Sequence, residues 1–153
     1  MDVKYVNSFI TGLMDIFGML GMNSVQRTGL AKRAKLRTDN DVNVIIGLVG
    51  SIKGNVVLSM PESTAKNIAS TMMGGMAVEQ FDMMPKSAIC ELTNMVAGSS
   101  MSKLEQMGTV VNITPPMLIN GKNMISMISQ VETLVISFNT NEGPLEMNVA
   151  TED

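Results

Sequence analysis

One carboxylate and one carboxamide stand three residues apart in the segment SAICELTNMVAG, which runs from Ser87 to Gly98. Glu91 and Asn94 would project side by side from a helix, because residues three or four apart share one helix face. Ser87 and Gly98 extend this stripe and leave almost no bulk beside the polar pair. The stripe is either a solvated helix face or a surface that another protein approaches closely, and periodicity alone favours the solvated face.

The chain lacks the residues that several other kinds of catalytic site need. It contains no His, which excludes a Ser-His-Asp triad and a histidine metal site. Cys90 is the single cysteine, so no internal disulfide is possible. Because the chain has no His, no imidazole can activate this thiol. The segment GLVGSIKGN lacks the GK[ST] of a phosphate-binding loop, so a hairpin turn is the better interpretation. We therefore expect no metal site, and any chemistry must use carboxylates, amides and hydroxyls or groups from a partner.

Composition predicts one domain, residues 1–153, with an unusual core. Hydrophobic residues make up 45% of the chain, aromatic residues only 3%, and 17 residues are Met. So many methionines can fill a core or form a pliable surface for a partner, and core filling is the favoured interpretation.

Charge and hydropathy limit the partners and the location. The net charge of -3 argues against nucleic acid, and the basic cluster KRAKLR, residues 32–37, is interpreted as a solvated strand face. No apolar run approaches the roughly 18 residues that span a bilayer, so no membrane is expected. The start MDVKYVNSF does not resemble a signal peptide. We expect a cytoplasmic protein.

Hydrophobic periodicity predicts helices separated by strands. The expected helices cover residues 3–20, 61–73 and 85–106, and the expected strands cover residues 28–37, 42–60 with a turn at 50–54, 108–114, 124–139 (split or bent) and 144–150. On the third helix, Ala88, Ile89, Leu92, Met95 and Val96 are predicted to face the core.

The order of helix and strands recurs, which suggests a degenerate internal duplication. One register places Gly12 and Asp15 of the first helix where the third helix has Glu91 and Asn94. In that register the first half carries no matching polar pair.

The segment ELTNMVAG, residues 91–98, resembles the E-x-x-N signature of the CheC/CheX phosphatases of bacterial chemotaxis, which are related to the flagellar switch protein FliM. Residues 50–61 resemble the family's glycine-punctuated hairpin, residues 72–75 the end of the next helix, and residues 115–121 the segment after the signature helix. The signature occurs once, as in CheX-type members. Ser87 stands where family members often carry an acidic residue.

The resemblance implies an α/β (α+β) fold of two layers, with long helices packed on a mainly antiparallel sheet. It implies a phosphatase that accelerates hydrolysis of the aspartyl phosphate of a CheY-like receiver domain. Asn94 would hold the attacking water, Glu91 would pair with a receiver lysine, and Ser87 and Gly98 would allow close contact. No cofactor of its own is implied, because the Mg²⁺ belongs to the receiver.

The resemblance also implies a homodimer that forms through strands, for which the strand-rich C-terminal part is a candidate. Two alternatives remain open at this point. One is a FliM-like receiver-binding or scaffold module without hydrolysis, which would have no need for the intact E-x-x-N pair. The other is a dimerisation domain with a solvated stripe.

Overall fold

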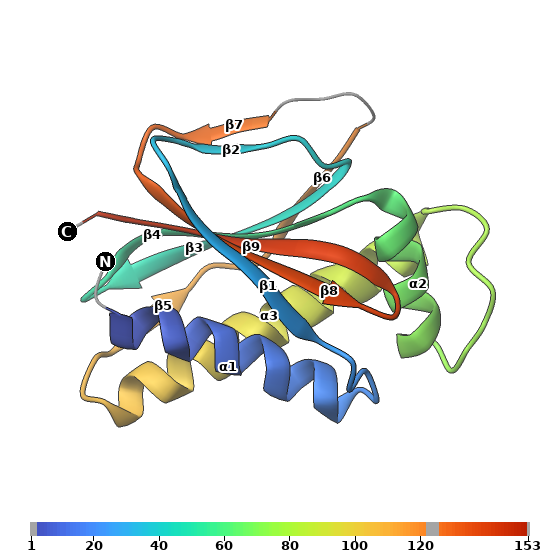
Figure 1. Ribbon diagram of the computed structural model, residues 1–153, viewed down its shortest axis with the longest axis horizontal. Coiled ribbons are helices and arrows are strands. Elements are labelled where there is room, and N and C mark those ends of the chain that lie inside the picture. The colour runs from blue at the N-terminus through green and yellow to red at the C-terminus, as the bar shows by residue number, and fades with distance from the viewer. Residues whose placement is uncertain (1–2, 122–125, 153) are drawn as a thin grey trace.

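A mainly antiparallel sheet with two long helices on one face organises the chain (Figure 1). The computed structural model describes residues 3–121 and 126–152. The helices are α1 (Val3–Met19), α2 (Glu62–Met72) and α3 (Met83–Gln106). The strands are β1 (Gln26–Arg33), β2 (Leu36–Thr38), β3 (Val42–Gly50), β4 (Lys53–Met60), β5 (Val111–Ile113), β6 (Met117–Asn120), β7 (Ser126–Ser129), β8 (Thr133–Thr140) and β9 (Gly143–Glu152).

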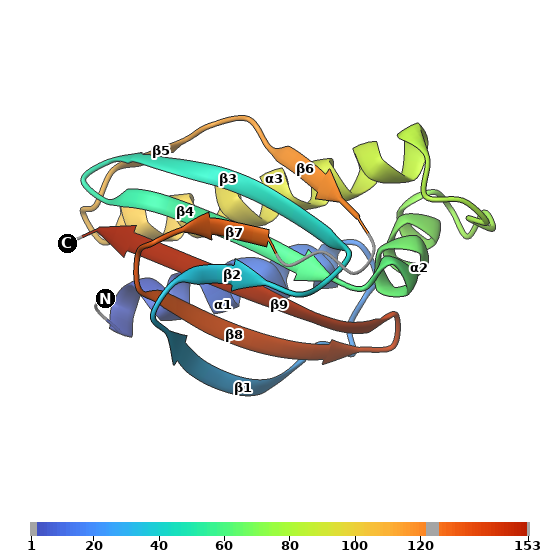
Figure 2. The ribbon, with the colours of Figure 1, turned by 90° about the horizontal axis from the view of Figure 1, so that it is seen from above.

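The main sheet has seven strands in the order β1-β8-β9-β4-β3-β5, and β6 also pairs with β3. All of the strand pairs in the described residues are antiparallel, and the core lies between this sheet and the helices. The predicted α+β architecture is confirmed. β2 and β7 form a separate two-stranded sheet on the face opposite α1 and α3 (Figures 1 and 2).

Helices α1 and α3 lie against each other along the open face of the sheet (Figure 1). Phe9, Leu13 and Phe17 recur at helical spacing on α1 and are fully buried, which is why this segment forms an amphipathic helix. At Gly12 the helices approach closely, because a Cβ there would lie 3.0 Å from the backbone nitrogen of Ser100. The predicted helix over residues 3–20 is confirmed, with its end at Met19.

Asp15 on α1 forms an ion pair with Lys103 of α3, with 2.7 Å between Oδ2 and Nζ. Gly12 and Asp15, the two α1 positions compared above with Glu91 and Asn94, therefore both face α3. Gly12 and Asp15 do not form a second exposed carboxylate–amide pair. The internal duplication itself stays a prediction.

The glycine-rich segment at residues 50–54 is a hairpin turn, as predicted, between β3 and β4. Gly54 has a φ of 155°, and a Cβ on it would lie 2.8 Å from the Cα of Thr151 on the neighbouring strand β9. Only glycine fits there, because any side chain would collide with backbone. Gly54 therefore allows β4 and β9 to pack closely.

The prediction of one strand over residues 28–37 is wrong. The chain bends at Ala34 and Lys35, so β1 stays in the main sheet while β2 crosses to pair with β7. The bend allows Leu36 to be buried against Val57 and Ala150. The basic cluster is a solvated surface, as predicted, and three of its four basic residues lie near carboxylates, in the pairs Lys32–Glu132, Arg33–Glu146 and Arg37–Asp39.

The strands after α3 differ from the prediction in number. The predicted strand 108–114 is the short β5, and a strand at residues 117–120, β6, was not predicted. The split predicted within 124–139 is confirmed by β7 and β8, although residues 124 and 125 lie outside the described residues. β8 and β9 are each flanked by strands on both sides, so they offer no free edge for a homodimer.

The methionines are divided between the core and the surface. Met22, Met60, Met101 and Met147 are buried in the core. Half of the methionines whose burial is described are exposed, which the favoured core-filling interpretation did not predict: Met14, Met19, Met76, Met83, Met84, Met107 and Met117. Three of these, Met83, Met84 and Met117, lie in the first turn of α3 or directly after Pro116.

Candidate functional site

The residues on the inner face of α3 pack into the core, and this packing determines which residues are exposed on its outer face. Ile89, Leu92 and Val96 are buried, as predicted, whereas Ala88 and Met95 are only half-buried against the core. The buried sector is rotated from the predicted one, because α3 also buries Thr93 and Ala97.

Thr93 can be buried because its hydroxyl donates a hydrogen bond to the carbonyl oxygen of Ile89 at 2.8 Å. Ser100 makes the same kind of bond to Val96 at 2.9 Å. These bonds satisfy the polar groups that face the core, so both side chains can be buried there.

Ser87, Glu91 and Asn94 are exposed on the outer face of α3, and Gly98 is half-buried. The first three line one open groove of about 470 Å³, so the structure brings the predicted carboxylate and amide together. Gly98 does not line this groove, and a Cβ on it would meet no atom within 4 Å. Gly98 therefore continues the stripe beyond the groove.

Four further residues line the groove that sequence reasoning did not assign to the site: Met83, Lys86, Cys90 and Pro116. Met83, Lys86 and Cys90 follow helical spacing, so extending the stripe toward the start of α3 would have found them. Pro116 lies in the connection between β5 and β6, and no local sequence signal places it beside α3.

The groove contains a carboxylate, an amide, a hydroxyl, an ammonium group and a thiol. Burial raises the pKa of the Cys90 thiol, which favours the neutral form over the nucleophilic thiolate. In the described part of the chain no group of three or more carboxylates and thiols could hold a metal ion. The arrangement can anchor a partner through Glu91 and can orient a small polar molecule through the Asn94 amide.

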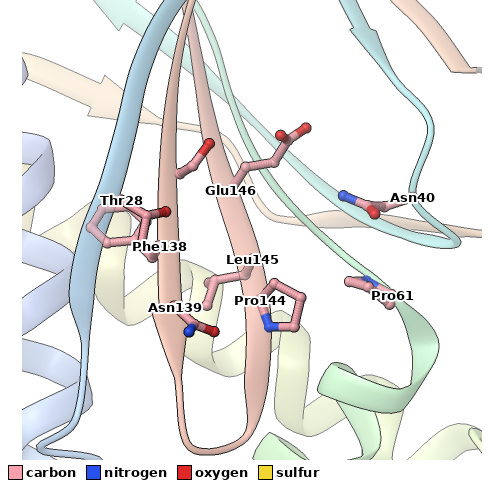
Figure 3. A pocket seen from close by; sticks show the side chains of 9 residues that line it. Thr28, Asn40, Pro61, Phe138, Asn139, Pro144, Leu145 and Glu146 are labelled. Atoms are coloured by element: carbon pink, nitrogen blue, oxygen red, sulfur yellow. The ribbon is translucent and has the colours of Figure 1, made fainter.

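Another pocket, of about 410 Å³, lies between β1, the β8–β9 hairpin and the start of α2 (Figure 3). Its carboxylate, Glu146, lies 3.7 Å from the guanidinium of Arg33, and its Asn40 amide donates a hydrogen bond to the Ser59 hydroxyl at 3.1 Å. These polar groups already have partners within the fold. The α3 groove, whose Glu91 carboxylate takes part in no ion pair in the described residues, is the better candidate for chemistry with a partner.

Comparison with known proteins identifies the family. Residues 42–139 match the family model described as chemotaxis phosphatase CheX. The CheY-P phosphatase CheX of Thermotoga maritima is 36% identical over 126 residues, which are 81% of this chain and 80% of that protein. The chain belongs to the CheX family of chemotaxis phosphatases.

Solved structures agree with this assignment. The CheX-CheY-BeF3-Mg²⁺ complex from Borrelia burgdorferi contains a chain that is 26% identical, with a TM-score of 0.83 and coverage of 97% of this chain and 98% of that one. A CheC-like superfamily protein from Shewanella sp. PV-4 has the same fold, with a TM-score of 0.88, 24% identity and complete coverage of both chains.

Proposed function

We propose that this chain is a protein phosphatase that accelerates hydrolysis of the aspartyl phosphate of a CheY-like response regulator. Membership of the CheX family supports the reaction, and the similar CheX chain solved with CheY, BeF3 and Mg²⁺ supports the partner. The observation that carries the proposal is the exposed pair of Glu91 and Asn94 in one groove of a rigidly packed helix. Such a pair can enter another protein's active site without any change in the fold.

The reaction needs little from this chain beyond correct placement. Water attacks the phosphorus of the acyl phosphate, the bond between phosphorus and the aspartyl oxygen breaks, and inorganic phosphate and a free carboxylate result. Asn94 acts as the residue that orients this water, because its amide accepts a hydrogen bond from the water and donates one to a neighbouring oxygen. The groups that stabilise the transferred phosphoryl, Mg²⁺ included, belong to the receiver.

Glu91 serves as the anchor. It lies one helical turn before Asn94 and exposes its carboxylate beside the amide, so an ion pair with a receiver lysine would fix where Asn94 lands. The apolar rim of Met83 and Pro116 adds contact area around this charged pair. Met83 is 82% exposed, and a flexible thioether can adapt to a partner surface.

We also propose that one domain, residues 1–153, carries this function, and that the protein forms a homodimer in the cytoplasm. The support for a dimer is β1, an eight-residue strand at the end of the sheet with Leu30 exposed. Among the described residues, no helix combines the length and apolarity needed to cross a membrane.

The experiment that tests the function measures the rate at which candidate receivers lose phosphate, with and without this protein. We expect acceleration for at least one CheY-like receiver that is proportional to the concentration of added protein. Tight binding to a phosphorylated receiver with no acceleration would instead favour the non-catalytic, FliM-like binding module.

A further inference from the structure

Lys86 lies at the candidate site, and its ammonium group forms no ion pair that would stabilise the fold in the described residues. Its side chain lines the groove together with Glu91 and Asn94. Several other basic residues lie near carboxylates of this chain: Lys32, Arg33, Arg37, Lys66 and Lys103. In the described residues, Lys86 has no such ion pair, although Asp82 stands four residues earlier on the same helix face.

The place of Lys86 in α3 does not favour the helix either. It is the fourth residue of α3, within the first turn, and that turn contains no acidic residue. The partial positive charge at a helix N-terminus disfavours a cation there. A neutral or acidic residue at position 86 would therefore suit the isolated helix better than lysine does.

Viewed down the helix axis, Lys86 and Glu91 lie on opposite sides of Asn94. At about 100° per residue, Lys86 is rotated by about 80° from Asn94 in one direction and Glu91 by about 60° in the other. Along the axis, at 1.5 Å per residue, Lys86 lies about 12 Å from Asn94 and Glu91 about 5 Å. A lysine side chain is shorter than 12 Å, which favours a contact beside a phosphoryl group held at Asn94 over a contact with the phosphoryl group itself.

We infer that Lys86 is a second docking residue, which pairs with an acidic side chain on the receiver surface beside the phosphoryl site. This inference rests on the proposed function. Lys86 is the cation among the residues that line the groove, and an unpaired ammonium group at the edge of a contact is complementary to an acidic side chain of the partner. Lys86 and Glu91 together hold the receiver at two points of opposite charge, both on the N-terminal side of Asn94 along the helix.

Steady-state kinetics on a phosphorylated receiver test this role, with the variants Lys86→Gln and Lys86→Glu. We expect the half-saturating receiver concentration to rise about 2–5-fold for Lys86→Gln and about 10-fold for Lys86→Glu at low salt, with the maximal rate within about twofold of wild type. Both effects should shrink at about 0.5 M salt, because an exposed ion pair is screened. The melting temperature of Lys86→Gln should stay close to that of wild type, which separates lost docking from lost folding.

Lys35→Glu is the matched control, because it changes the net charge by the same amount. Lys35 is exposed in the bend between β1 and β2, a connection that lies on the side of the sheet away from α3 (Figure 1). Half-saturation for Lys86→Glu no higher than for Lys35→Glu would overturn the inference and leave the proposed function intact. A wild-type protein that accelerates no receiver would overturn both proposals.

Discussion

Replacement of Gly98 by Ala should stabilise the fold and weaken receiver docking. Gly98 lies inside α3, and a Cβ on it would meet no atom within 4 Å, so the new methyl group enters open space. Alanine favours the helix interior over glycine by about 1 kcal/mol. For a domain of this size, that gain raises the melting temperature by about 2–4 °C.

Gly12→Ala is the contrasting control, since Gly12 also lies inside a long helix. A Cβ at Gly12 would lie 3.0 Å from the backbone nitrogen and 3.1 Å from the Cα of Ser100. Overpacking of a tight contact costs about 1–3 kcal/mol, which exceeds or cancels the gain in helix propensity. Circular dichroism melting of both variants should therefore show a rise for Gly98→Ala and none, or a fall, for Gly12→Ala.

The docking half of this prediction depends on Gly98 being a contact that a receiver approaches closely. Gly98→Ala should then raise the half-saturating receiver concentration although the protein is more stable. A stabilised Gly98→Ala variant with unchanged half-saturation would remove Gly98 from the docking surface. A destabilised variant would refute the reasoning that α3 is open at this position.

Three further expectations follow from the same site and fold. Glu91→Gln should raise the half-saturating receiver concentration more than it lowers the maximal rate, because a desolvated anchor lost from an interface costs about 2–5 kcal/mol; a loss of maximal rate alone would assign Glu91 to the chemical step. Light scattering should give the mass of a dimer at tens of micromolar, and a monomer mass would contradict assembly through β1. Because burial raises the pKa of the Cys90 thiol, iodoacetamide should label it at pH 8 more slowly than a free thiol, and a bound receiver should slow it further; labelling as fast as that of a free thiol would contradict this.

Local periodicity was sufficient to predict that Glu91 and Asn94 are exposed on α3, whereas their assignment to a site came from the family resemblance. The exposure of Glu91 and Asn94 follows from the helical spacing of Ile89, Leu92 and Val96, which fixes which face of α3 is buried. The predicted sector was nevertheless rotated from the observed one. Thr93 is polar and was not assigned to the core, yet it is buried because its hydroxyl bonds to the helix backbone.

The parts that sequence reasoning missed depend on contacts between distant segments. Pro115 and Pro116 indicate the end of a strand, but the chain resumes pairing with β3 at Met117 and forms β6. Thr114 makes this possible, because its backbone N–H and its hydroxyl both bond to the backbone of Gly47 and hold the interruption against β3. The same contact carries Pro116 to the groove, so the wall opposite α3 could not be predicted from local pattern.

The split of β1 from β2 has a similar cause. Residues 28–37 alternate as one strand would, and nothing in their local pattern requires a bend. The bend occurs because Leu36 is buried against Val57 of β4 and Ala150 of β9, residues that lie far away in the sequence. Burial of a leucine stabilises by about 1.5–3 kcal/mol, enough to override a local strand preference.

The most direct test of the central claim compares Asn94→Ala with wild type on one receiver in two assays. The first measures binding to the receiver in its BeF3–Mg²⁺ form, which cannot be hydrolysed, and the second measures loss of phosphate from the phosphorylated receiver at saturating concentration. Asn94 is exposed and its side chain lies off the buried face of α3, so the variant should fold normally and bind with an affinity within a few-fold of wild type. We predict that its maximal rate falls to that of the receiver alone. Full activity in a folded Asn94→Ala variant would contradict the proposal that Asn94 positions the attacking water.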